Sequence, residues 1–179
     1  MLDMIPAWRI ALAVCLTIPA NAVHATDRCD DLLDRESPAF AKQTPKEFDL
    51  TPGQGWRLLA TEGCKAQAAV AIQRFLSEGD RPYHVYFHGA QMDATVGNYP
   101  AALEKLQRAR RPEMAADSPF KWNDYVDAVA AFLRRDLDSL RRCRQEIAQR
   151  ADVPGNAANL KVVDQLIDHF GKPYGEIFR

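Results

Sequence analysis

Two histidines, His84 and His88, are four residues apart, and on a helix this spacing places both imidazoles on one face. Such a pair supplies two ligands to a metal ion, but a zinc site needs a third protein ligand and, for hydrolysis, usually a carboxylate base. The helical zinc-protease pattern has Glu directly after its first His, where this chain has Val85, and the nearby Asp93 is more than a turn away. We therefore predict no metal ligand and favour two surface histidines that line a groove. A small metal-binding protein or hydrolase with its site at His84 and His88 is the alternative hypothesis.

Other residue types that perform chemistry do not fall into catalytic patterns. None of the four serines lies in a Gly-x-Ser-x-Gly turn. The sequence Gly53-Gln-Gly55 lacks the third glycine and the preceding strand of a nucleotide-binding loop. The formal net charge is −1, which gives no reason to expect nucleic acid or an anionic membrane as a partner. We predict no catalytic residue, no enzyme activity and no cofactor.

Helical periodicity dominates the chain from residue 55 onward. Pro82 suits the first turn of a helix, Gly97-Asn98 turns the chain, and Pro100 starts the next helix. After Ser118, apolar side chains recur at three- and four-residue intervals, which excludes a strand. The predicted helices span residues 56–62, 65–77, 82–96, 100–109, 119–133, 137–147 and 159–170.

A repeat with a period of 34 residues relates two of these helices, because Gly63, Ala68 and Ile72 align with Gly97, Ala102 and Leu106. The second copy resembles a tetratricopeptide repeat. The residues that carry the resemblance stand where that family has its turn glycine, aromatic, small crossing residue, large apolar residue and second small residue: Gly97, Tyr99, Ala102, Leu106 and Ala109.

The resemblance implies an all-α fold, a short array of about 2.5 antiparallel helical hairpins closed by a C-terminal capping helix. It also implies a concave groove lined by the first helix of each hairpin. The candidate groove residues on those helices are Tyr83, Tyr86, Asp93, Trp122 and Tyr125. We predict a non-catalytic scaffold that binds a protein or peptide of the cell envelope through this groove, and a self-associating structural subunit is a further alternative.

The N-terminal part of the chain has a different composition. Residues 1–25 have the order of a signal peptide, with Arg9 before an apolar run of about nine residues, which is too short to span a membrane, and cleavage is expected after Ala22 or Ala25. We predict a periplasmic or secreted protein without a transmembrane segment. Residues 26–54 are polar and broken by prolines, which predicts a loop-rich segment, and residues 55–179 form the helical domain.

Three cysteines remain after residue 25. Cys143 falls on the apolar side of its predicted helix, which indicates a buried thiol. Cys29 and Cys64 flank the loop-rich segment and form the candidate disulfide, which would tie this segment to the array. Two free thiols at these positions are the competing interpretation.

Overall fold

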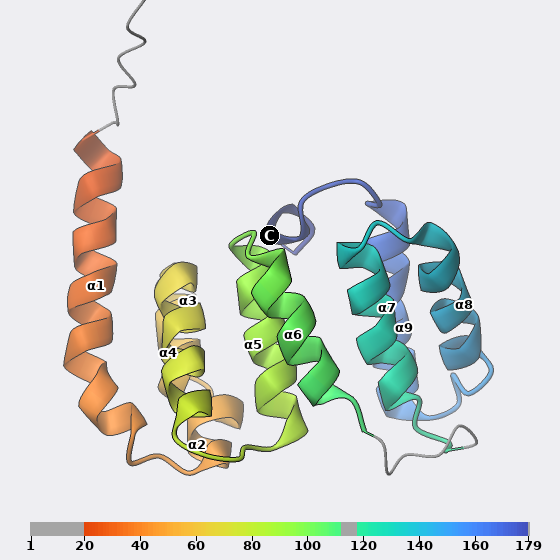
Figure 1. Ribbon diagram of the computed structural model, residues 1–179, viewed down its shortest axis with the longest axis horizontal. Helices are drawn as coiled ribbons and strands as arrows, with labels where there is room; N and C mark the ends of the chain where they lie inside the picture. The colour runs from red at the N-terminus through yellow and green to blue at the C-terminus, as the bar shows by residue number, and fades with distance from the viewer. Residues whose placement is uncertain (1–19, 112–117, 179) are drawn as a thin grey trace, which may run out of the picture.

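The computed structural model describes the backbone of residues 20–111 and 118–178, and side chains within these ranges from Asp27 onward. Every regular element in these residues is a helix and no strand forms, so the predicted all-α class is confirmed. Figure 1 shows the helices standing side by side, from α1 at one end to α8 at the other. Their bounds are α1 (Ala20–Phe40), α2 (Pro45–Leu50), α3 (Gly55–Thr61), α4 (Lys65–Ser77), α5 (Tyr83–Thr95), α6 (Tyr99–Ala109), α7 (Trp122–Leu133), α8 (Leu137–Ala148), α9 (Pro154–Asp168) and the 3-10 helix η1 (Tyr174–Glu176).

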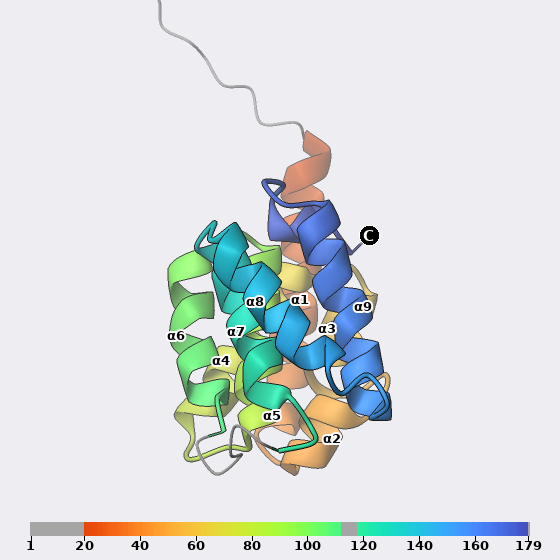
Figure 2. The same cartoon turned by 90° about the vertical axis from the view of Figure 1, so that its right-hand side faces the viewer.

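Consecutive helices pair as the hairpins α3–α4, α5–α6 and α7–α8, and α9 packs against both α7 and α8. Figure 2 shows this end of the array, with α9 beside the last hairpin. The observed bounds agree closely with the predicted ones except at two helix starts: α7 begins at Trp122 and α9 at Pro154. The buried Asn156 side chain accepts a hydrogen bond from Lys121 N and donates one to Pro119 O, so the start of α9 is fixed by packing.

The hairpin α5–α6 has the closest helix packing. Gly97 turns the chain with a φ of 83°, a conformation that glycine adopts without strain. Gly89 faces α4 and α6, and a β-carbon there would lie 2.9 Å from Ile72 Cγ2 and 3.0 Å from Lys105 Cδ. Ala102 is fully buried. Small residues on both helices therefore allow the backbones to approach.

The N-terminal segment differs from the prediction, because residues 26–40 continue α1 and residues 45–50 form α2. Most of the predicted signal peptide lies outside the described residues, and residues 20–25 form the start of α1. Leu32, Leu33 and Phe40 are buried against the array, since α1 packs on α3 and α4. Pro38 lies in the last turn of α1, which ends two residues later at Phe40. The loop-rich prediction for residues 26–54 is therefore wrong over both helices: tertiary packing stabilises a segment whose composition is polar.

The predicted disulfide between Cys29 and Cys64 is present, and it joins α1 to the residue before α4. Arg28 next to it donates a hydrogen bond to Glu62 O at 2.7 Å. Cys143 is a free, half-buried thiol. Burial, reinforced by the nearby charges of Asp127 and Asp124, raises the pKa of this thiol to about 11.

The C-terminal tail returns from α9 to the α5–α6 hairpin, as Figure 1 shows. Tyr174 N donates a hydrogen bond to Tyr99 Oη at 3.2 Å, and Gln91 Nε2 donates one to Tyr174 Oη at 3.4 Å. A β-carbon on Gly175 would lie 2.2 Å from Thr95 O, so only glycine permits this contact. None of the described helices is long and apolar enough to cross a membrane.

Candidate metal centre

The short helix α2 carries a carboxylate into the interior. Thr44 and Glu47 form a capping box at its start: Thr44 Oγ1 accepts a hydrogen bond from Glu47 N, and Thr44 N donates one to Glu47 Oε2. Phe48 is fully buried and stacks on Phe75 of α4 with ring centroids 4.0 Å apart. Because Phe48 anchors α2 against the core, the next residue, Asp49, is also placed where none of its surface is exposed.

Asp49 lies between the two histidines of α5. His84 Nδ1 is 2.6 Å from Asp49 Oδ2, and His88 Nδ1 is 2.8 Å from Oδ1 and 2.9 Å from Oδ2. Trp56 of α3 donates its indole N–H to Asp49 Oδ1 at 2.8 Å. An ionised carboxylate has only acceptor atoms, so in the neutral imidazoles the Nδ1 atoms carry the protons and the Nε2 atoms do not. Three helices, α2, α3 and α5, thus meet at one carboxylate.

Electrostatics keep this carboxylate ionised. Burial is the largest single influence and by itself raises the pKa of Asp49. Hydrogen bonds from His88, His84 and Trp56, together with the charge of His88, outweigh it and lower the pKa of Asp49 below its ordinary value. Asp49 is therefore an anion at neutral pH although its side chain has no exposed surface.

The histidine side chains are less enclosed than the carboxylate. The exposed fractions are 24% for His84 and 22% for His88, against zero for Asp49. Aromatic rings surround them, with the Tyr83 ring 5.5 Å from the His84 ring and the Trp56 ring 5.7 Å from the His88 ring. The site is accordingly a buried anion reached through two partly exposed imidazoles.

The three residues have the composition of a metal-ligand set. One ligand atom from each of Asp49, His84 and His88 can be chosen so that all three lie within 4.8 Å of one another. In the part of the chain that the structure describes, no other group of three His, Cys, Asp or Glu residues meets this condition. One carboxylate oxygen and two imidazole nitrogens suit zinc, and also copper or nickel. Trp56 would orient the carboxylate from outside the ligand set.

The sequence identified two of these residues and missed the third. Asp93, which follows the histidine pair closely in sequence, does not join it: Asp93 forms a buried ion pair with Lys105, with Asp93 Oδ2 and Lys105 Nζ 2.6 Å apart. Asp49 precedes His84 by 35 residues, and no local pattern connects them. The Thr44–Glu47 capping box was the visible indication that a helix begins before Asp49.

The remaining predicted groove residues are mostly inside the protein. Tyr86, Trp122 and Tyr125 are 3%, 8% and 5% exposed. Trp122 donates its indole N–H to Ala109 O at 2.8 Å, and its ring lies 5.0 Å from the partly buried Tyr83 ring. In this structure these aromatic side chains fill the space between α5, α6 and α7 and do not form an open surface.

The predicted repeat-packing residues lie at helix contacts. Ala102, Leu106 and Ala109 of α6 are buried. Gly97 makes the turn before α6, and the Tyr99 hydroxyl receives the C-terminal tail as described above.

Fold and site together define an all-helical hairpin array with one carboxylate and two imidazoles gathered where α2 meets α5. Comparison with models of known protein families, with curated proteins and with solved structures finds no match.

Proposed function

We propose that this protein binds one divalent transition-metal ion, of which zinc is the reference case, through Asp49, His84 and His88. The observation that carries the proposal is a fully buried carboxylate within 2.9 Å of two imidazole nitrogens on consecutive turns of α5. The third ligand that a zinc site requires, and that the sequence alone did not supply, is Asp49.

The three side chains must move relative to one another for the ion to enter. Zinc–ligand distances of about 2.0–2.1 Å in a tetrahedral site separate the ligand atoms by about 3.3 Å. The present separations between Asp49 oxygens and the two Nδ1 atoms are 2.6–2.9 Å, and one ligand atom from each of the three residues can be chosen so that all lie within 4.8 Å of one another. The ion would take the place of the two Nδ1 protons, and each Nε2 would then carry a proton.

Three protein ligands leave a fourth position for water or an exchangeable ligand. A closed structural site uses four protein ligands, whereas the set found here leaves one coordination position open. The partly exposed histidines give the ion access from solvent. A metal-binding or carrier role is accordingly preferred to a purely structural one.

The proposed setting is the periplasm or the extracellular space. A disulfide persists in an oxidising compartment, and residues 1–25 have the order of a removable signal peptide. The hairpin array, with Gly97, Ala102 and Leu106 at the positions described, supports the proposal that the domain is a divergent relative of tetratricopeptide-repeat proteins.

Calorimetric titration of the chain beginning at Thr26 with zinc tests the proposal. We expect one ion per chain, loss of binding in His84→Ala/His88→Ala and at least about tenfold weaker binding in Asp49→Asn. His169→Ala is the matched control, because His169 is a partly exposed histidine directly after α9, far in sequence from the site, and this variant should bind zinc as the wild type does. Circular dichroism verifies that each variant is folded. An absence of zinc binding in the wild type, or undiminished binding in the double variant, would refute the proposal.

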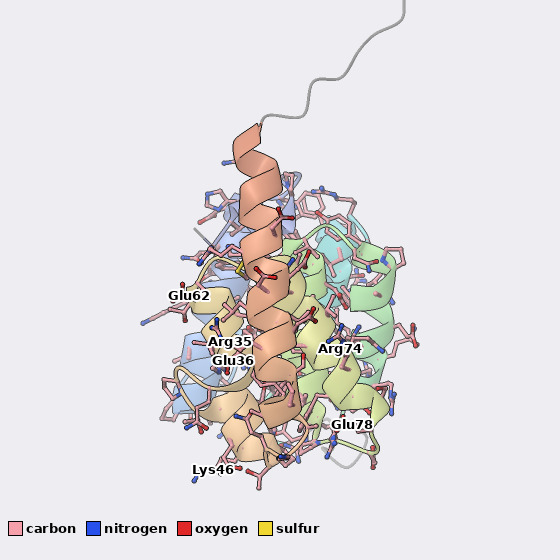
Figure 3. The ribbon with its side chains drawn as sticks, turned by 90° about the vertical axis from the view of Figure 1, so that its left-hand side faces the viewer. Arg35, Glu36, Lys46, Glu62, Arg74 and Glu78 are labelled. Atoms are coloured by element: carbon pink, nitrogen blue, oxygen red, sulfur yellow. A yellow bond between two sulfur atoms is a disulfide. The ribbon has the colours of Figure 1, made fainter. Side chains whose placement is uncertain are left out.

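Protein binding is a second candidate function, favoured by a different surface from the one that the sequence indicated. An open cavity of about 400 Å³ lies between α1 and α3. Figure 3 shows Arg35, Glu36 and Glu62 on that side of α1. The lining residues are Arg28, Leu32, Arg35, Glu36, Leu58 and Glu62.

In-cell crosslinking with mass spectrometry tests this second candidate. Arg35→Glu should lose a crosslinked envelope protein that the wild type captures, whereas Lys46→Glu, on the same face in Figure 3 but outside the cavity, should retain it. Equal capture by both variants would argue against this cavity as a docking surface. Mass measured against protein concentration tests the self-association hypothesis.

A further inference from the structure

The metal ligands belong to two parts of the chain that can separate. We call residues 26–54 the N-terminal arm; it contains most of α1, all of α2 and therefore Asp49. His84 and His88 belong to α5, inside the array. The arm is continuous with the array at one point, residues 54–55, and it packs on α3, α4 and α5. An opening of the arm would carry Asp49 away from both histidines.

The disulfide gives the arm a second attachment. Cys29 lies on α1 and Cys64 lies directly before α4, at a sequence separation of 35. The closed loop contains Asp49 and its hydrogen-bond donor Trp56, whereas the two histidines lie outside it. Without the disulfide, the opened arm is attached to the array at one end only. With the disulfide, the opened arm is a loop attached at both ends, so opening increases its conformational entropy by a smaller amount.

An ion held by Asp49 and the histidine pair acts on the same opening equilibrium, because it binds the closed arm and loses one ligand when the arm opens. The two cysteines of the disulfide are also buried, with Cys29 9% and Cys64 1% exposed, so a reductant reaches the disulfide chiefly when the arm is open. Two attachments that favour the same closed state must reinforce each other, and the effect is reciprocal.

We infer that the Cys29–Cys64 disulfide and the ion at Asp49, His84 and His88 are coupled, so that reduction of the disulfide promotes release of the ion and the bound ion protects the disulfide. This inference rests on the proposed function. In the reduction, a dithiol attacks the Cys29–Cys64 bond and becomes a disulfide itself, and its two electrons and two protons convert both cysteines to thiols. The ion leaves unchanged in oxidation state. The site thereby becomes a metal store that a dithiol reductant opens.

Exposed polar contacts add to the apolar packing that holds α1 on the array once the disulfide is broken. Gln67 Nε2 donates to Asp30 Oδ1 at 2.9 Å and Arg74 Nη1 donates to Ser37 Oγ at 3.1 Å, both from α4. Each is exposed and each adds little stability. Figure 3 shows α1 crossing this face with its beginning projecting beyond the array, and the disulfide at Cys29 is attached to the first half of this helix.

The first test is the rate at which a strong chelator removes zinc from the loaded chain. We expect Cys29→Ser/Cys64→Ser to release zinc at least about tenfold faster than the wild type, with an upper limit of several hundred-fold from the entropy of a loop this long. Cys143→Ser, which alters a thiol outside the loop, should release zinc at the wild-type rate.

The second test needs no change to either cysteine. Wild-type protein is treated with a phosphine reductant, with and without zinc, and the new thiols are trapped by alkylation and counted by mass spectrometry. Zinc should slow reduction at least about tenfold in the wild type and have no effect in His84→Ala/His88→Ala. A phosphine is used because thiol reductants themselves bind zinc.

The outcomes separate this inference from the function on which it rests. If zinc binds the wild type but neither the release rate nor the reduction rate changes, the coupling is wrong and the metal site stands. If zinc does not bind the wild type at all, the proposed function fails first. If the serine variant does not fold, the reduction experiment on the wild type still decides the question.

Discussion

Replacing Lys105 by Met should strongly destabilise the protein, because it leaves the Asp93 carboxylate buried without a counter-ion. Asp93 and Lys105 join α5 to α6, with Nζ and Oδ2 2.6 Å apart and side chains only 8% and 10% exposed. Methionine retains most of the aliphatic stem, which packs against Gly89, and removes the charge. The substitution therefore isolates the electrostatic effect from the loss of packing.

The magnitude follows from the burial of the pair. Breaking a buried ion pair by removing one partner costs about 3–5 kcal/mol. For a domain of this length, 1 kcal/mol corresponds to about 2–4 °C in Tm, so the melting temperature should fall by about 6–20 °C. Replacing both partners, as Asp93→Leu/Lys105→Met, removes the unpaired charge as well. The double variant should recover most of the lost stability.

Urea unfolding followed by circular dichroism at 222 nm measures both effects. An unchanged m-value shows that the two variants unfold from comparable folded states. A loss below about 1 kcal/mol in Lys105→Met, with an unchanged m-value, would refute the reasoning, since that is the range of an exposed ion pair. It would also return Asp93 to the role of a groove residue, in which case Asp93→Asn should impair partner binding and leave stability unchanged.

Three further predictions concern α2 and the free thiol. Gly55→Ala should lower the free energy of unfolding in urea by about 2–5 kcal/mol, because Gly55 has a φ of 52° and the new β-carbon would lie 2.0 Å from Phe48 O. Gly53 has a φ of 70° but open space around it, so Gly53→Ala should lower the same free energy by only about 1–2 kcal/mol. Phe48→Ala should lower the free energy of unfolding by about 3–5 kcal/mol and should also weaken zinc binding, because it loosens α2. Leu50→Ala, at a side chain 49% exposed, should change the free energy of unfolding by no more than about 0.5 kcal/mol. Urea unfolding measures the stability of both variants, and calorimetry measures their zinc binding. Because the pKa of Cys143 is raised to about 11, its alkylation by iodoacetamide at pH 8 should be about 100-fold slower than that of an ordinary thiol. The alkylation rate should increase as the pH rises toward about 11. A rate that levels off near about pH 9 would contradict the raised pKa.

Local patterns were sufficient for the helices of the array. The α4 bounds, Lys65–Ser77, coincide with the predicted helix, and Gly97 makes the predicted turn before α6. These features depend on residues close in sequence: apolar spacing, a proline in the first turn and a glycine at positive φ. The bonded pair of Cys29 and Cys64 was also the predicted one, although spacing alone left free thiols as an alternative.

The N-terminal arm shows where local patterns fail. Its prolines and charges favour loops, yet α1 and α2 form because Leu33, Phe40 and Phe48 find apolar partners on the array. Helical stability in proteins comes largely from tertiary packing of an apolar face, which an inspection of composition does not detect. Tertiary packing also explains why the expected groove is absent at these positions: Tyr86, Trp122 and Tyr125 are buried in the core between α5, α6 and α7.

The sequence by itself determined the helical class, the hairpin turns and the common face of His84 and His88, because each is fixed by residues within a few turns of one another. Only the tertiary structure decided what that face meets. Asp49 reaches the histidines because stacking of Phe48 on Phe75 seats α2 beside α5, and this contact joins residues that are distant along the chain. Packing that the spacing of residues does not encode thus brought Asp49 to the histidine pair and made a candidate three-ligand site.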